Sequence, residues 1–220
     1  MAISANDPEL GGWRNLGEEP IVETPWFRLR RARVELPGPG GRQLDHYLIR
    51  LPVLTMTAMV DAQDQVLLVL RHRFIPDNRG WELPSGIAEL GADPADLAAI
   101  ASRQALAETG WEAVGPKPML TLQQNAGLTD SAVHIFITRQ AVQHGPPEAD
   151  FEAERIEWMP LAEVPALIAT GAVKDASTAT ALLWLRAGLN ADEDFSFGEE
   201  LAAVFRDFPR RSLRDQAMPG

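Results

Sequence analysis

Short stretches in which apolar and polar residues alternate fill the first quarter of the chain. A strand shows this period of two, because successive side chains point to opposite faces of a sheet. The alternation occupies residues 26–30 and 31–36, stops at the proline- and glycine-rich turn 37–41, and returns in residues 44–49. We therefore expect residues 12–52 to form a small antiparallel sheet.

More strongly apolar segments follow. Strands are expected in five of them: residues 54–60, 66–70, 119–123, 132–138 and 156–159. The first two flank a polar turn at residues 61–64, which predicts a hairpin. Residues 144–151 are polar and contain proline, and these features are typical of a loop.

Helical patterns occur between and after these strands. They cover four segments: residues 93–109, 161–169, 179–187 and 199–205. Asp93 is expected to cap the first helix, and Asp175 or Ser177 the third. Gly110 and Gly188 stand where these two helices should end, because glycine readily adopts the left-handed conformation of a helix stop. Strands alternating with a few helices predict an α/β sandwich.

Composition and charge exclude several classes of protein. The chain has 220 residues, and 31 acidic against 20 basic residues give a net charge of −11, which argues against nucleic acid as a partner. A small phosphorylated ligand needs only a few local bases and stays possible. No cysteine is present, so disulfides and thiolate metal sites are excluded. The first residues do not read as a signal peptide, and no apolar run approaches the ~20 residues of a membrane helix, so a cytoplasmic protein with no membrane partner is expected.

The segment from Gly86 to Trp111 carries part of a catalytic motif. It reads GIAELGADPADLAAIASRQALAETGW and resembles the Nudix box, G-x5-E-x7-R-E-U-x-E-E-x-G-U, where U is a bulky apolar residue. Gly86, Arg103 and residues 108–111 match the pattern, but the family's E-x-x-E-E reads QALAE here. One carboxylate of these three is kept. Ala92 stands where the family has its earlier glutamate, and ten residues separate it from Arg103 where the pattern has seven.

The resemblance reaches well beyond the box. Similarity to the ADP-ribose pyrophosphatase-like branch of the Nudix hydrolases continues in five further segments: residues 66–74, 81–86, 127–136, 152–161 and 171–176. It implies an α/β fold, a Nudix-type α/β/α sandwich with a mixed central sheet, together with a small N-terminal antiparallel sheet that helps to build a homodimer. The chain would divide into N-terminal strands at 1–52, a Nudix domain at 53–188 and a tail at 189–220.

In the family, glutamates one helical turn apart hold Mg²⁺ or Mn²⁺, which bridges a pyrophosphate while an activated water attacks phosphorus. Glu108 matches a metal ligand, Gln104 shares its helix face but offers only a neutral oxygen, and Glu89 keeps its place in the box loop. Asp96 lies eight residues before Gln104, about 12 Å along a helix, and is too distant to join them. A weakly bound ion is therefore expected.

The resemblance also supplies candidates for the chemistry around the ion. Glu152 and Glu154 lie in the loop that carries the family's water-activating glutamate, although each is equally consistent with a solvated loop acid. Arg103 would orient the box acids or form a structural ion pair. His134, on an alternating strand, is expected to be a core histidine.

The substrate side of the site has its own candidates. They are Arg71, Arg73, Trp81 and Glu82. Arginine suits the oxygens of a diphosphate, because its planar fork donates two hydrogen bonds at once. Trp81 would either stack on a base or be buried in the core.

Two functions follow from these observations. The first is hydrolysis of the pyrophosphate of a nucleoside diphosphate linked to another group, similar to ADP-ribose or a nucleotide sugar. We expect this activity to be weak or atypical, because the box has lost metal ligands that stabilise the transition state. Each ~1.4 kcal/mol of lost transition-state stabilisation costs a factor of ten in rate. The alternative is a degenerate Nudix domain that acts as a nucleotide-binding or regulatory protein. A third hypothesis is that the same fold carries out a different chemistry, but nothing in the sequence favours it.

Overall fold

The computed structural model describes residues 12–88, 93, 96–148 and 153–189. The chain forms two compact units, Met1–Leu51 with Asn125–Ser131, and Pro52–Gln124 with Ala132–Gly220. Within the described ranges no helix has both the length and the apolar character to cross a membrane.

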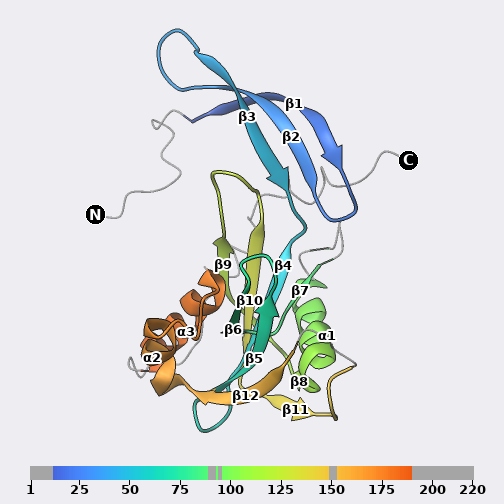
Figure 1. Cartoon of the computed structure of the whole chain (residues 1–220), viewed down its shortest axis with the longest axis vertical. Helices are drawn as coiled ribbons and strands as arrows, with labels where there is room; N and C mark the ends of the chain where they lie inside the picture. The colour runs from blue at the N-terminus through green and yellow to red at the C-terminus, as the bar shows by residue number, and fades with distance from the viewer. Residues whose placement is uncertain (1–11, 89–92, 94–95, 149–152, 190–220) are drawn as a thin grey trace. The chain divides into compact units, whose positions relative to one another are not determined.

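The first unit is an antiparallel sheet of three strands in the order β1-β2-β3 (Figure 1). These are β1 (Arg14–Glu23), β2 (Arg28–Glu35) and β3 (Gln43–Arg50), which confirms the small N-terminal sheet. The two alternating segments at 26–30 and 31–36 belong largely to one strand, β2, and not to two.

A segment from the middle of the chain, Asn125–Ser131, completes this unit. Asp130 accepts hydrogen bonds from the Arg50 guanidinium at 2.9 Å and from the Leu51 N–H at 3.2 Å. The Ile49 N–H donates to the carbonyl of Leu128 at 2.9 Å. These contacts attach the segment to the end of β3, across about 80 residues of sequence separation.

The second unit contains a mixed sheet and an antiparallel one. In the order β7-β4-β10-β9, β4 (Leu54–Met59) runs parallel to β10 (Ala132–Thr138), while β7 (Ser85–Ile87) and β9 (Lys117–Gln123) are antiparallel edges. The other sheet has the order β12-β5-β6. Its strands are β5 (Gln65–Arg73), β6 (Asn78–Glu82) and β12 (Arg155–Pro160). The strands β8 (Trp111–Ala113) and β11 (Ala141–Gln143) form a short pair.

The hairpin expected around residues 61–64 is wrong in its pairing. The turn exists, but β4 and β5 share only an isolated bridge between Val60 and Val66 before they enter different sheets. Each strand is buried on both faces, so its apolar pattern does not say which neighbour it pairs with.

Helix α1 (Leu97–Thr109) ends as predicted and begins later than predicted. Gly110 is left-handed with φ 74°, and a Cβ there would lie 2.0 Å from the carbonyl oxygen of Gly145, so only glycine fits. The residue at the cap position of α1 is Asp96 and not the expected Asp93, and the Asp96 side chain makes no capping hydrogen bond. The Asp96 N–H instead donates to the carbonyl of Asp93 at 2.8 Å.

Two further helices follow β12. A 3-10 turn, η2 (Leu161–Glu163), leads into α2 (Val164–Ala169), and α3 (Ala176–Leu189) follows. The Asp175 carboxylate accepts the Thr178 N–H at 2.6 Å and so caps α3, as predicted. The stop expected at Gly188 is wrong, because this glycine lies within α3. The helix expected at 199–205 lies outside the described residues.

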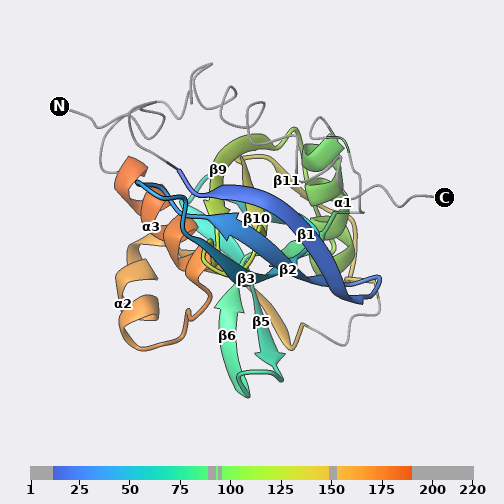
Figure 2. The same cartoon turned by 90° about the horizontal axis from the view of Figure 1, so that it is seen from above.

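The helices of the second unit cover opposite faces of its sheets (Figures 1 and 2). On one face Ile135 of β10 and Leu68 of β5 share a core with α2 and α3, through Val164 and Leu182. On the other face Phe136 packs with residues of α1. This alternation along β10 produces the predicted α/β sandwich with a mixed sheet.

Candidate active site

An open cleft of about 860 Å³ lies in the second unit, beside the end of β5. Its charged lining consists of three basic residues, Arg71, Arg73 and Lys174, and two acidic ones, Glu82 and Asp175. The tip of the β5–β6 hairpin adds the exposed apolar side chains of Phe74 and Ile75. The described lining of the cleft thus carries one more basic than acidic side chain.

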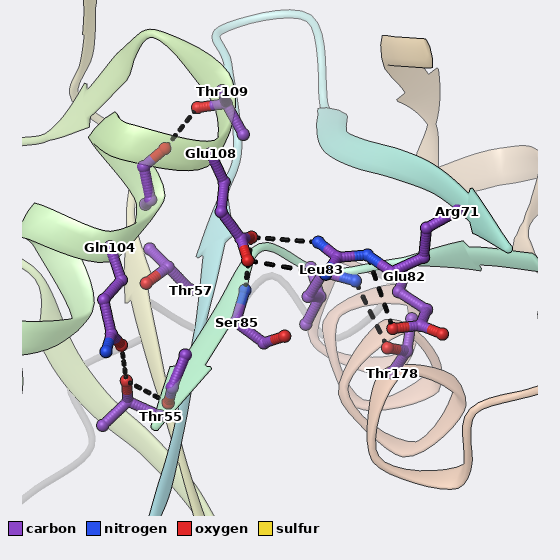
Figure 3. Close-up of polar contacts among 12 residues, drawn as sticks. Thr55, Thr57, Arg71, Glu82, Leu83, Ser85, Gln104, Glu108, Thr109 and Thr178 are labelled. Carbon is purple, nitrogen blue, oxygen red and sulfur yellow. Dashed lines mark hydrogen bonds and ion pairs between the residues drawn. The ribbon is translucent and has the colours of Figure 1, made fainter. Parts of the chain in front are cut away.

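Arg71 joins the cleft to helix α1. Its guanidinium donates to both carboxylate oxygens of Glu108, at 3.0 Å and 3.4 Å (Figure 3). The backbone N–H of Ser85 donates to the same carboxylate at 2.9 Å. The Arg71 side chain is only 2% exposed and that of Glu108 17%, so this pair is largely shielded from water.

A second ion pair continues the network along β5. Arg73 donates two hydrogen bonds to Glu82, at 3.1 Å and 2.6 Å, in the bidentate geometry that suits a carboxylate. Glu82 also lies 3.8 Å from the Nε atom of Arg71. Glu108, Arg71, Glu82 and Arg73 thus form a network of alternating charge, and the last three of them line the cleft.

Gln104 lies one turn before Glu108 on α1, and both ends of its amide are engaged. Its oxygen accepts a hydrogen bond of 2.7 Å from the hydroxyl of Thr55, and its nitrogen donates to the carbonyl of Ile87 at 2.8 Å. Gly86 leaves the space for it, since a Cβ at that position would lie 2.1 Å from the Gln104 Cδ. Gln104 therefore ties α1 to β4 and β7.

The remaining carboxylate candidates are placed differently. Glu154 is partly exposed, and both its oxygens accept hydrogen bonds of 2.9 Å from the Nε of Arg79. Glu89 and Glu152 lie outside the described residues. Arg103 is exposed and makes no ion pair within the described part of the chain, so its expected contact with a box acid stays a prediction.

Two aromatic candidates belong to the core. Trp81 is buried among core residues and does not line the cleft, and the guanidinium of Arg155 lies 5.7 Å from the centre of its ring. Of the two expectations for Trp81, burial in the core is the one that the structure favours over stacking on a base. His134 is buried as predicted, next to the hydroxyl of Thr121 at 3.1 Å, and burial lowers the pKa of His134 to about 4.

Sequence reasoning missed four groups that shape the site. Thr55 and the Ile87 carbonyl hold Gln104, and the Ser85 N–H holds Glu108. Lys174 joins the lining of the cleft from the segment before α3, where its ammonium donates to the carbonyl of Arg79 at 2.6 Å. Only Lys174 had a sequence signal, as one of two lysines in the chain.

The model of the NUDIX domain matches residues 51–182, which include the cleft, α1 and the box. The chain belongs to the Nudix family. A second model, the nucleoside diphosphate sugar hydrolase N-terminal domain, matches residues 13–49 of this Nudix protein. The family resemblance drawn from the sequence is thereby confirmed.

Characterised relatives share much of the length of this Nudix protein. It is 36% identical over 171 residues to the CMP-5'-(N-acetyl-N-hydroxy-3-aminopropyl)phosphonate hydrolase of Streptomyces rubellomurinus, covering 78% of this chain and 81% of that one. It is 28% identical over 149 residues to the ADP-ribose pyrophosphatase of Mycobacterium tuberculosis, covering 67% and 70%. A crystal structure of an ADP compounds hydrolase shares the fold, with a TM-score of 0.68, 16% identity and coverage of 83% and 96%.

Nudix hydrolases generally use Mg²⁺ or Mn²⁺. The described residues of this member do not fit a divalent ion held by the box helix. Both oxygens of Glu108 are engaged by Arg71, the amide of Gln104 is occupied at both ends, and Ala107 has no ligand atom. Among the described residues, no three acidic or histidine side chains form a group that could hold a metal ion. Gln104 is thus placed as a structural residue and not as the expected ligand.

Proposed function

We propose that this Nudix hydrolase cleaves the phosphoanhydride of a nucleotide joined to a second group. The observation that carries the proposal is the cleft beside the end of β5, whose lining has Arg71, Arg73 and Lys174 against two acids. A diphosphate carries several negative oxygens, and guanidinium groups bind such oxygens in pairs. The partial exposure of Arg73 leaves its guanidinium accessible from the cleft.

The reaction needs few groups. A water oxygen forms a bond to one phosphorus, the bond from that phosphorus to the bridging oxygen breaks, and the leaving phosphate takes the electron pair. The proton of the water passes to a carboxylate, and we assign this role to Glu152 or Glu154, in the loop that leads into β12. The arginines hold the phosphate oxygens in line and offset the charge that develops on them.

The relatives support the substrate class. Their names describe hydrolysis of a CMP-linked phosphonate and of ADP-ribose, and both compounds contain a nucleotide joined to another group. We propose ADP-ribose, a nucleotide sugar or a nucleotidyl phosphonate as substrate here. Weak activity and weak binding of Mg²⁺ or Mn²⁺ stay predictions, based on the loss of charged groups from the box.

A second candidate function is nucleotide binding without hydrolysis. The observation that favours it is the structural role of Gln104, whose amide makes a hydrogen bond within the protein at each end. A domain of this kind would keep the cleft and its arginines, but it would lack the turnover that a hydrolase shows.

A substrate screen separates the two functions. The purified protein is incubated with ADP-ribose, nucleotide sugars, dinucleotides and a CMP-phosphonate, with Mg²⁺, Mn²⁺ or EDTA, and products are separated by chromatography. We expect turnover of at least one compound. It should be lost in Arg73→Met and kept in the control Arg139→Met, which changes an exposed arginine that does not line the cleft. No turnover, together with thermal stabilisation by nucleotides in EDTA, would contradict the hydrolase and support the binder.

We further propose that the N-terminal sheet forms a homodimer. Its support is the set of exposed apolar side chains on that unit, with Trp13 60%, Trp26 71% and Tyr47 54% exposed. Light scattering should give twice the chain mass, and Trp26→Glu should shift it toward the monomer. The cytoplasmic location, the absence of a nucleic-acid partner, and the domain limits at 52/53 and 188/189 stay predictions.

A further inference from the structure

The position of Arg71 leaves little room for a cation beside Glu108. Its guanidinium lies 3.0 Å and 3.4 Å from the two carboxylate oxygens, and the Ser85 N–H lies 2.9 Å from one of them. A divalent ion on this carboxylate would lie within a few ångströms of a buried positive charge. Charges in a largely buried site are poorly screened, so the ion and the guanidinium would repel each other strongly.

We propose that Arg71 takes the place of a divalent ion at Glu108. Its guanidinium pairs with the one carboxylate kept from the family's E-x-x-E-E, and because Arg71 also lines the cleft, the same group is held there for the diphosphate of the substrate. This inference rests on the proposed function for the identity of the ligand. It adds that diphosphate binding in this protein does not need an ion held by α1.

Two independent observations support the replacement. Gln104, the other candidate ligand on the same face of α1, uses both ends of its amide to hold β4 and β7. Among the described residues, no three acidic or histidine side chains form a group that could hold a metal ion, whereas a Mg²⁺ site needs several hard, mostly anionic oxygen ligands.

Glu108 acquires a new role in this arrangement. It accepts from Arg71 and from the Ser85 N–H, so it fixes the guanidinium against the strand that enters the box. Glu82 lies on the other side of Arg71, at 3.8 Å from its Nε. Glu108 is therefore a positioning residue that holds Arg71 ready for the ligand, because a group fixed before binding loses little freedom when the ligand arrives.

The first test measures Mn²⁺ alone, by electron paramagnetic resonance of the free ion in a titration. The wild-type protein should show no saturable Mn²⁺ binding that depends on Glu108, and Glu108→Gln should give the same titration. The double variant Arg71→Gln/Gln104→Glu should gain a Mn²⁺ site, because two carboxylates one turn apart are then free of the guanidinium. Saturable binding in the wild type that is lost in Glu108→Gln would overturn the inference.

The second test measures the affinity for ADP, as a stable diphosphate probe, by titration calorimetry. The wild type should bind ADP with similar affinity in EDTA and in Mg²⁺. Arg71→Met should weaken binding in EDTA by about tenfold or more, Arg71→Lys should weaken it less, and Arg139→Met should leave it unchanged. ADP binding that requires Mg²⁺ in the wild type would overturn the inference.

Neither test depends on turnover or on a single variant. Circular dichroism reports whether Arg71→Met is folded, and Arg71→Lys keeps the charge if it is not. If the substrate screen shows no hydrolysis while ADP binds in EDTA, the proposed hydrolase fails and the role of Arg71 stands. If hydrolysis is found and requires Mn²⁺ bound through Glu108, the hydrolase stands and the role of Arg71 fails.

Discussion

The hydroxyl of Thr55 donates a hydrogen bond of 2.7 Å to the side-chain oxygen of Gln104, which joins strand β4 to helix α1. The amide nitrogen of the same glutamine donates to the carbonyl of Ile87 in β7. A glutamate at this position would have no N–H for that carbonyl. The residue that removes charge from the box is therefore also the residue that holds the box helix to the sheet.

Restoring the family's glutamate at this position should cost stability. In Gln104→Glu the carboxylate faces the Ile87 carbonyl without a donor between them, and we expect a loss of about 1 kcal/mol in the free energy of unfolding. Urea denaturation at pH 7 measures the change. Gln143→Glu, which adds the same charge on an exposed edge strand, is the control and should be close to neutral. Equal stability of the two variants would contradict the structural role of Gln104.

The contact between Gly86 and Gln104 predicts a coupled pair. A methyl group at residue 86 would overlap the Gln104 amide, so Gly86→Ala should destabilise the protein by about 1–3 kcal/mol. In the double variant Gly86→Ala/Gln104→Ala the overlap is gone. A double-mutant cycle from denaturation curves should then give a total loss smaller than the sum of the single losses. Additive losses would show that the two residues do not compete for the same space.

Breaking the ion pair between Arg79 and Glu154 from either side distinguishes a structural role of Glu154 from a catalytic one. Because this pair is exposed, its removal should change stability by less than about 1 kcal/mol. If Glu154 accepts the proton of the attacking water, Glu154→Gln should lower kcat by about 100-fold or more. Arg79→Gln breaks the same pair and keeps the carboxylate, so it should retain much more activity. Full activity of Glu154→Gln would assign the proton to another group, with Glu152 as the next candidate.

Burial of His134 predicts a loss of stability in acid. The pKa of His134 is about 4 in the folded protein against 6.5 for the free group, so between these values the unfolded chain binds a proton that the folded chain does not. The free energy of unfolding therefore falls as the pH falls from 6.5 to 4, by up to ~3 kcal/mol from this residue.

The comparison of His134→Gln with wild type isolates this contribution. Urea denaturation at pH 7 and pH 4.5 should show a smaller loss in the variant, because glutamine does not titrate. His144→Gln, at an exposed histidine, is the control and should keep the wild-type loss. The same loss in His134→Gln and wild type would contradict the buried, neutral histidine.

Much of the fold was predictable where local signals were strong. Residues 132–138 form β10 as expected, because a continuous apolar run suits a strand buried on both faces. Gly110 ends α1 because the close approach of Gly145 admits no side chain. Strand β1 was harder to define, since two register shifts interrupt its alternation. The course of β4 and β5 was predicted wrongly, because a turn fixes chain reversal and not sheet membership.

The site was predictable as a set of residues but not as a set of contacts. Arg71 and Glu108 were both candidates, yet they are 37 residues apart in the chain and were assigned to substrate and to metal. Gln104 was assigned as a weak ligand because its partners, Thr55 and the Ile87 carbonyl, have no sequence signature. A motif gives the helix face on which a side chain lies, whereas its hydrogen-bond partners depend on how other strands pack against that face.

The central claim is that Arg71 occupies the cation position at Glu108 in a Nudix cleft that binds a diphosphate. Its most direct test is a crystal structure of the protein with ADP and MnCl₂, in which anomalous scattering locates manganese. We predict the ADP diphosphate in the cleft beside Arg71 and Arg73, and no manganese on Glu108. A manganese peak within coordination distance of a Glu108 oxygen, with Arg71 displaced from the carboxylate, would contradict the account.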